Sequence, residues 1–119
     1  MILIYAPSPI NSDEIHKQID TLKNKLSMFF VDDNDFLFST EANQKLLREL
    51  IINHNVFFFY THSIKDMNMT PTEVAELVLF LITKANCDFQ SEIDNIYFTK
   101  KDMDIIYPTI FEIFKTKHK

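Results

Sequence analysis

The first residue that could do chemistry is Ser8, which lies between Pro7 and Pro9 directly after the apolar run Met1–Tyr5. A loop serine can attack a carbonyl or phosphoryl group if a neighbouring base takes its proton. The charge that develops on the substrate must then be met by donors or cations placed in advance. Arg48 is the only arginine and lies in a predicted helix, so no arginine cluster can form around Ser8. We interpret Ser8 as a loop serine and predict no catalytic residue in this segment.

Three carboxylates, Asp32, Asp33 and Asp35, follow the predicted strand Met28–Val31. Ligand sites in parallel sheets lie beyond the carboxyl ends of the strands, and carboxylates are the ligands that Mg²⁺ prefers. The segment lacks the glycine and the distal glutamate of a calcium-binding loop. We interpret it as a solvated acidic loop, and magnesium binding by these aspartates stays an open alternative.

The remaining candidates are the histidines and the cysteine. No metal-ligand spacing relates any of these residues to another: His16, His54, His62, His118 and Cys87. His62 and Ser63 are adjacent, and adjacent side chains of an extended segment point to opposite faces, so they cannot form a nucleophile–base pair. Cys87 has no neighbouring cation to lower its pKa and is interpreted as a structural thiol. We predict neither a catalytic site nor a metal or cofactor.

Composition limits the function classes further. With 119 residues, 46% of them hydrophobic and 24% charged, residues 1–119 are predicted to form one globular domain. The chain contains no glycine, which excludes the glycine-rich phosphate loops of the common nucleotide-binding motifs. A net charge of −5 gives no basic footprint, so we do not expect direct binding to nucleic acid.

Three features concern the cellular location. The single cysteine fits a reducing compartment. The first residues lack the pattern of a secretion signal, and the longest apolar stretch, Val74–Ile82, is too short to span a bilayer. We therefore predict a cytoplasmic protein that does not bind membranes.

Strands and helices alternate along the chain. Continuous apolar runs predict buried strands at Met1–Tyr5, Met28–Val31, Val56–Tyr60 and Cys87–Ser91. Apolar stripes of helical period predict helices over about 11–26, 41–53, 70–84 and 99–117. Thr40, Thr70 and Thr99 are the expected caps of the last three helices. This alternation predicts a three-layer α/β fold with a mainly parallel four-stranded sheet and helices on both faces.

The last helix carries more apolar surface than one core-facing side requires. One stripe consists of Met103, Ile106, Ile110 and Ile113, and a second consists of Tyr107, Phe111 and Phe114. An exposed apolar face usually marks a partner site. We therefore predict that this helix binds a protein partner or a second copy of the chain, and that Pro108 kinks or restarts it.

Several segments share the spacing of one family. They are Tyr5-Ala6 for an opening Y-A, Gln18 to Lys23 for R-Q-x-x-x-L-K, Phe30–Leu50 for the stretch from the second strand through the L-x-x-L-L-x-x-L helix, Asn55–Tyr60 for D-x-L-V-V-W, Glu73–Leu81 for the following helix, and Phe89–Asp94 for F-x-S-x-x-x-x-I-D. Together they resemble the catalytic domain of the small serine recombinases, the resolvases and invertases, across almost the whole chain. The resemblance implies a resolvase-like fold and a last helix that mediates dimerisation.

The chain departs from this family at the residues that carry its chemistry. Where the family has Y-A-R-V-S-T, Pro7 replaces the first arginine and Pro9 replaces the nucleophilic serine, with Ser8 between them. Where the family has D-R-L-G-R-S, the segment begins at Ser63, and Ile64 and Met67 replace both arginines. Guanidinium groups suit the charge of a phosphoryl transition state. Their loss predicts a degenerate site without strand-exchange activity.

We consider three functions. The first is a non-catalytic, recombinase-like regulator that acts by protein–protein contact. Eleven lysines against one arginine and the absence of glycine indicate an AT-rich gene, such as one from a phage or mobile element. The second is a small-ligand or Mg²⁺-dependent enzyme using Ser8, Asp32, Asp33 and Ser63 at the strand ends. The third is a DNA-binding accessory factor using the lysines of the last helix and tail.

Overall fold

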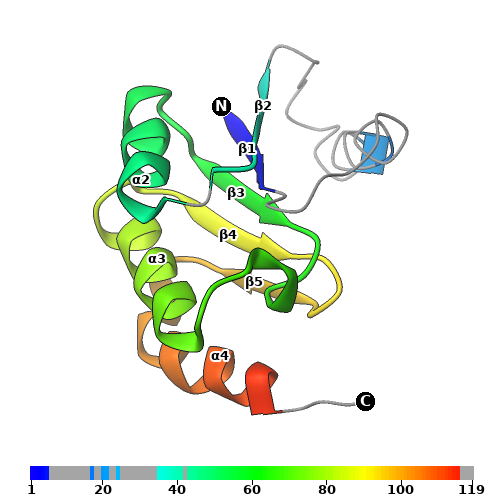
Figure 1. The fold of residues 1–119 in the computed structure, drawn as a ribbon, viewed down its shortest axis with the longest axis vertical. Helices are drawn as coiled ribbons and strands as arrows, with labels where there is room; N and C mark the ends of the chain where they lie inside the picture. The colour runs from blue at the N-terminus through cyan, green and yellow to red at the C-terminus, as the bar shows by residue number, and fades with distance from the viewer. Residues whose placement is uncertain (6–16, 18–19, 22–23, 25–34, 42, 116–119) are drawn as a thin grey trace.

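The computed structural model describes residues 1–5, 17, 20–21, 24, 35–41 and 43–115 (Figure 1). These residues form an α/β fold. Its elements, in chain order, are β1 (Ile2–Tyr5), β2 (Phe36–Ser39), α2 (Gln44–Asn53), β3 (Phe58–Thr61), the 3₁₀ helix η3 (Lys65–Met67), α3 (Pro71–Thr83), β4 (Asp88–Ser91), β5 (Ile96–Phe98), the 3₁₀ helix η4 (Lys100–Ile105) and α4 (Ile106–Lys115).

The described strands form one mixed sheet in the order β2-β1-β3-β4-β5. Strands β1 to β4 run parallel, and β5 pairs antiparallel with β4. The prediction of a mainly parallel sheet is therefore confirmed, but the expected number of four strands is wrong. Phe36–Ser39 forms strand β2 and Ile96–Phe98 forms strand β5, and neither strand was predicted. Met28–Val31 lies outside the described residues.

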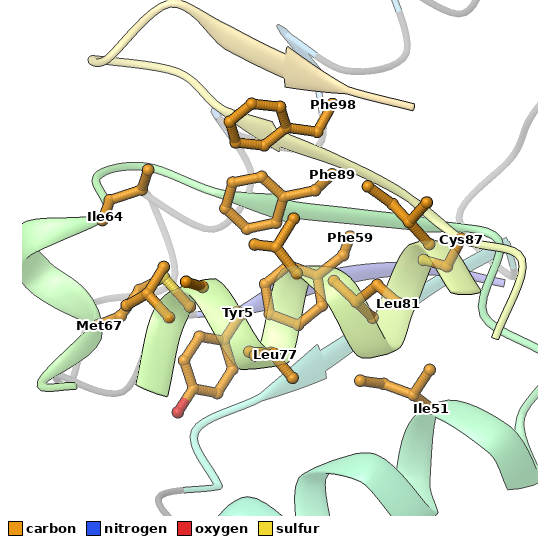
Figure 2. Close-up of a cluster of buried hydrophobic side chains, with 14 of the residues drawn as sticks. Tyr5, Ile51, Phe59, Ile64, Met67, Leu77, Leu81, Cys87, Phe89 and Phe98 are labelled. Atoms are coloured by element: carbon orange, nitrogen blue, oxygen red, sulfur yellow. The ribbon is translucent and has the colours of Figure 1, made fainter. Parts of the chain in front are cut away.

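Aromatic side chains on one face of the sheet form the centre of the core (Figure 2). The rings of Phe59 and Phe89 lie 5.6 Å apart, and those of Phe89 and Phe98 lie 6.1 Å apart. This row crosses three neighbouring strands because Phe59, Phe89 and Phe98 are paired in register. Leu77 and Leu81 of α3 belong to the same fully buried cluster, so the helix packs directly on the row.

The helices that the structure describes all pack on this face. Leu47 and Ile51 of α2, and Ile106 and Ile110 of α4, join the same buried cluster as the α3 residues. Figure 1 shows α2, α3 and α4 one after another along one side of the sheet. The opposite face has its own buried cluster of Ile2, Ile4, Phe36, Phe58 and Tyr60. The predicted helix over 11–26 lies largely outside the described residues, so helices on both faces stay a prediction.

Two of the three predicted caps are confirmed. Thr70 caps α3, and its hydroxyl and the Glu73 carboxylate form a reciprocal capping box. Thr99 forms a capping box with Asp102, although the segment that it starts is the 3₁₀ helix η4. Thr40 was the wrong cap, because Asn43 caps α2. Leu46, in the first turn of α2, is 49% exposed, whereas Leu47 and Ile51 face the core.

Pro108 restarts the last helix and does not kink it. The segment runs as 3₁₀ helix to Ile105 and as α-helix from Ile106. Pro108 therefore lies in the first turn of α4, where backbone N–H groups have no partner within an α-helix. The missing N–H of proline leaves no hydrogen bond broken at that position.

Candidate functional site

The carboxyl ends of the parallel strands meet at one edge of the sheet, which we call the carboxyl edge. The strand order changes direction between β1 and β3, and ligands of open α/β sheets bind at such a switch point. Tyr5 and Thr61, the last residues of β1 and β3, are paired in register. The two segments that resemble the recombinase motifs therefore leave the sheet side by side. Pro7, Ser8 and Pro9 lie outside the described residues.

The motif segment after β3 is built into the core. Ser63 is 8% exposed, Met67 is 1% exposed and Ile64 is fully buried. Figure 2 shows the side chains of Ile64 and Met67 at the edge of the buried cluster, on the loop that follows β3. They anchor this loop by packing, and neither can bind a phosphate. His62 is exposed while Ser63 is buried, which agrees with the expectation that they point apart.

Asp94 ties two loops together at this edge. Its Oδ2 atom accepts a hydrogen bond of 2.6 Å from the Ser91 hydroxyl and one of 2.9 Å from the backbone N–H of Ile64. We call this arrangement the Asp94 bridge. It joins the turn between β4 and β5 to the loop after β3. Asp94 was not singled out from the sequence, because nothing local signals an acceptor for an amide 30 residues away.

The other hydroxyl groups at the strand ends also have partners within the protein. The Thr61 hydroxyl donates to the carbonyl oxygen of Tyr5 at 3.2 Å. The Ser39 hydroxyl accepts from the backbone N–H of Glu41 at 3.1 Å. The Tyr5 hydroxyl donates to the Glu41 carbonyl oxygen at 2.7 Å, and burial together with the Glu41 charge raises the pKa of Tyr5. These groups hold strands and loops in place.

The remaining titratable candidates are poorly suited to catalysis. Burial, reinforced by the Asp88 charge, raises the pKa of Cys87 to about 12, so its thiol stays protonated at neutral pH. Burial, with the charge and hydrogen bond of Glu92, raises the pKa of Tyr60. Among the described residues no three His, Cys, Asp or Glu side chains come close enough to hold a metal ion. Asp35 is described, whereas Asp32 and Asp33 lie outside the described residues.

The last helix presents a different surface from the one that the two stripes predicted. Ile106 and Ile110 are fully buried in the core, and Ile113 and Phe114 pack against it, so none of these four forms an exposed face. Met103 leaves the first stripe because it lies on the 3₁₀ helix. Tyr107 and Phe111 are each 38% exposed, and their rings stack at 6.2 Å with an interplanar angle of 16°.

A groove of about 730 Å³ runs between α4 and the turn between β4 and β5. Its apolar lining includes Ile93, Ile96, Ile105 and Ile113. Ile93 is 64% exposed at the turn, and Ile105 is 49% exposed on η4. Neither was predicted as a site residue, although an isoleucine within a polar turn is an unusual choice that could have signalled it.

A second groove, of about 600 Å³, lies between α2 and α3. The Arg48 guanidinium carbon lies 5.1 Å from the centre of the Phe80 ring at this groove. Arg48 therefore lies in the helix layer and not at the ends of β1 and β3. Its guanidinium group makes a cation–π contact with Phe80.

Comparison of the chain with protein-family models, with curated proteins and with solved structures found no match. Among the helices of the described part, none combines the length and the apolar character that crossing a membrane requires.

Proposed function

We propose that this protein is a non-catalytic α/β domain that acts by binding another protein chain through η4 and α4. The observation that carries the proposal is the stacked, exposed pair of Tyr107 and Phe111. Aromatic side chains are enriched at the centres of protein interfaces. Held against each other, the two rings form an apolar surface that loses little conformational freedom when a partner covers it.

The exposed apolar residues of the described part also concentrate in this segment. Four of the ten large hydrophobic side chains that are exposed, Met103, Ile105, Tyr107 and Phe111, lie on η4 and α4. Single exposed hydrophobic residues are ordinary in folded proteins, whereas a group of them on one element indicates an interaction site. We call these four residues of the two consecutive helices the α4 surface; Ile105 belongs to it through the groove beside α4, and Tyr107 and Phe111 form its stacked pair.

The resemblance to serine recombinases supports the same proposal and adds a biological setting. The segments that correspond to the family's two catalytic motifs begin at neighbouring strand ends, Tyr5 and Thr61. Where the family has arginines, Ile64 and Met67 pack into the core. A recombinase-like protein without these cations would retain contact with other chains as its role. We propose a regulator encoded by a phage or a mobile element.

The two other candidate functions have weaker support. Of the residues that an enzyme at the strand ends would use, Ser63 is 8% exposed, and Ser8, Asp32 and Asp33 lie outside the described residues. The polar groups around Ser63 are engaged in internal hydrogen bonds: Thr61, Ser91 and Asp94. A DNA-binding helix would need an excess of positive charge to neutralise the phosphates. Lys100 and Lys101 instead share η4 with Asp102 and Asp104.

The test is affinity capture from extracts of the cells in which the gene is expressed, comparing wild type with Phe111→Asp. We expect a stoichiometric protein, a second copy of the chain included, to co-purify with the wild type and to be lost with the variant. Phe57→Asp is the matched control, because Phe57 is equally aromatic, is 53% exposed and lies outside η4 and α4. Equal capture by wild type and Phe111→Asp, with both variants folded by circular dichroism, would contradict the proposal.

A further inference from the structure

We propose that the groove between α2 and α3 binds a small zwitterion, an α-amino acid with an apolar side chain. The groove lies at the α2 end of the helix layer, and the α4 surface lies at the other end (Figure 1). A ligand here would not touch the α4 surface, so the site is independent of the proposed function. Two buried polar atoms without partners, and the charges and apolar side chains around them, support this assignment.

Arg48 is the only arginine of the chain, and part of its guanidinium group is unmatched. The guanidinium carbon lies 5.1 Å from the centre of the Phe80 ring, so the ring covers one face of the group. The Nε atom is buried and has no hydrogen-bond partner among the described residues. A guanidinium group stacked on a ring keeps its edge of N–H donors for a carboxylate, which it can bind with two parallel hydrogen bonds.

Gln44 shows the complementary defect one helical turn before Arg48. Its Oε1 atom is also buried and receives no hydrogen bond from a described residue, Arg48 included. Residues four apart are neighbours on a helix face, so the unmatched acceptor and the unmatched donor lie close together. Both side chains are half-buried and line the groove, so a change of rotamer turns the two atoms toward a ligand. A ligand that offers an acceptor and a donor would remove the cost of both unpaired atoms.

The other charged residues of the groove match the two ends of an amino acid. Lys45, on the same helix as Arg48, supplies a second positive charge for the carboxylate. Glu49 and Glu76 are exposed at the groove and supply acceptors for the ammonium group. Glu73 also lines the groove, but its Oε1 atom already accepts a backbone N–H in the capping box of α3. Opposite charges therefore lie within one groove, as a zwitterion requires.

The apolar part of the lining fits a hydrocarbon side chain. Ile52, which is 48% exposed, and the Phe80 ring both lie in the groove. The groove volume of about 600 Å³ falls within the roughly 300–1,000 Å³ of small-molecule sites. A side chain of the size of leucine can therefore cover apolar surface that is otherwise exposed to water.

Simpler ligands would leave part of the groove unmatched. An anion would meet Arg48 and Lys45 but would also face the glutamates, and a cation would meet the glutamates but would face the two basic groups. A purely apolar ligand would leave the two buried atoms unpaired. A zwitterion with an apolar side chain satisfies the donors, the acceptors and the apolar wall and brings no net charge into the groove.

The first experiment is a titration of the isotope-labelled full chain with L-leucine, followed by NMR. The groove is open to solvent and covers only part of a ligand, so we expect a dissociation constant on the order of millimolar. Shift changes should centre on Gln44, Arg48 and Phe80 and should be absent from the α4 surface. Absence of these changes up to about 50 mM leucine, far above the expected constant, would overturn the proposal.

Three analogues of leucine test which of its groups are recognised. Isopentylamine lacks the carboxylate, isocaproate lacks the ammonium group, and N-acetyl-leucine amide lacks both charges. Each should bind at least about fivefold more weakly than leucine, because each leaves one or both kinds of charged group in the groove unpaired. Binding of any analogue as tight as that of leucine would overturn the proposal, and equal binding of the blocked amide would assign the groove to a peptide segment.

The second experiment separates a ligand site from a structural contact. Arg48→Met keeps the length of the side chain and a contact with the Phe80 ring but removes the donors. It should bind leucine at least about tenfold more weakly, while the urea midpoint stays the same or rises because an unpaired buried donor is gone. Arg48→Lys keeps the charge and should still weaken binding about threefold, because an ammonium group lacks the paired donors of a guanidinium group.

A carboxylate variant and its control complete the test. Glu76→Gln should weaken leucine binding about threefold, a scale typical of exposed ion pairs, and should not weaken binding of isocaproate, which has no ammonium group. Asp104→Asn removes an exposed carboxylate outside the groove and should leave leucine binding unchanged. Binding of leucine to Arg48→Met as tight as to the wild type, or equal weakening by Glu76→Gln and Asp104→Asn, would overturn the proposal.

Discussion

Replacing Asp94 by alanine removes the acceptor on which the carboxyl edge of the sheet depends. The Oδ2 atom of Asp94 accepts from the Ser91 hydroxyl at 2.6 Å and from the Ile64 N–H at 2.9 Å. Ser91 and Ile64 are both fully buried. The substitution would therefore leave one hydroxyl and one amide without their partner, in places that water does not reach easily.

The expected effect follows from these two bonds. A hydrogen bond to a charged group contributes about 1.5–3 kcal/mol, and a buried donor left without a partner costs about 1–3 kcal/mol. Asp94 itself is only half-buried, so its own charge is partly solvated and the lower values apply. We expect Asp94→Ala to reduce the free energy of unfolding by about 2–4 kcal/mol, a large part of the roughly 5–15 kcal/mol typical of a domain.

The measurement is urea unfolding followed by circular dichroism. A shift of the midpoint to lower urea at an unchanged slope reports a loss of stability in the native state. Asp66→Ala is the matched control, because it removes an exposed carboxylate from the segment after β3, to which Asp94 is bridged, and should change stability by less than about 0.5 kcal/mol. Equal midpoints for the two variants would refute the reasoning, since the Asp94 bridge would then contribute nothing.

Three further predictions concern the core, the backbone and the thiol. Phe89→Ala should lower the free energy of unfolding, measured in urea, by about 3–5 kcal/mol, because the ring is fully buried between Phe59 and Phe98. Phe57→Ala, at an exposed position, should lower it by less than about 1 kcal/mol, as is usual for surface substitutions. Asn86 has a φ of 52°, so Asn86→Ala should destabilise by about 1 kcal/mol relative to Asn86→Gly, and equal stabilities would contradict a left-handed backbone there. Cys87 should react with a thiol reagent only on unfolding, and rapid labelling of the folded protein would contradict its burial. Because the pKa of Cys87 in the folded protein, about 12, exceeds its ordinary value of 9.0, the free energy of unfolding should fall as pH rises through that interval.

The sequence predicts the elements that carry a local pattern and misses those that depend on long-range pairing. Buried strands with continuous apolar runs, β1 and β3, were predicted to within two residues, and so was α3 with its Thr70 capping box. Strands β2 and β5 were missed because they lie at the two edges of the described sheet. Their strand conformation depends on pairing with β1 and β4, which no local pattern reports.

The chain also solves its lack of glycine in a way that only the backbone reveals. The left-handed positions among the described residues are Asn55, Asn68, Asn86 and Asn95, with φ between 52° and 58°. Asparagine tolerates this conformation better than other residues with a side chain. Each of the four marks the end of a helix or a turn, so asparagine in this glycine-free chain carries the signal that glycine carries elsewhere.

Of the four residues of the α4 surface, Met103, Tyr107 and Phe111 belong to the two predicted stripes and Ile105 does not. The apolar excess of the last helix was visible in the sequence, yet Ile106 and Ile110 are core residues. A change from 3₁₀ to α-helix at Ile106 shifts the phase of the stripes, so Met103 is exposed while Ile106 and Ile110, from the same predicted stripe, are buried. Ile93 lines the same groove as Ile105 and Ile113, although it lies in the turn between β4 and β5. Only the tertiary fold brings these residues together.

We propose that the α4 surface contacts another protein chain. Amide chemical shifts of the isotope-labelled protein, recorded from dilute to concentrated solution and with any captured partner, test it most directly. We predict shifts or line broadening at Met103, Ile105, Tyr107 and Phe111, with little change at Leu46 and Ile52, which are exposed on α2. Shifts confined to α2, or no change at the α4 surface under either condition, would contradict the account.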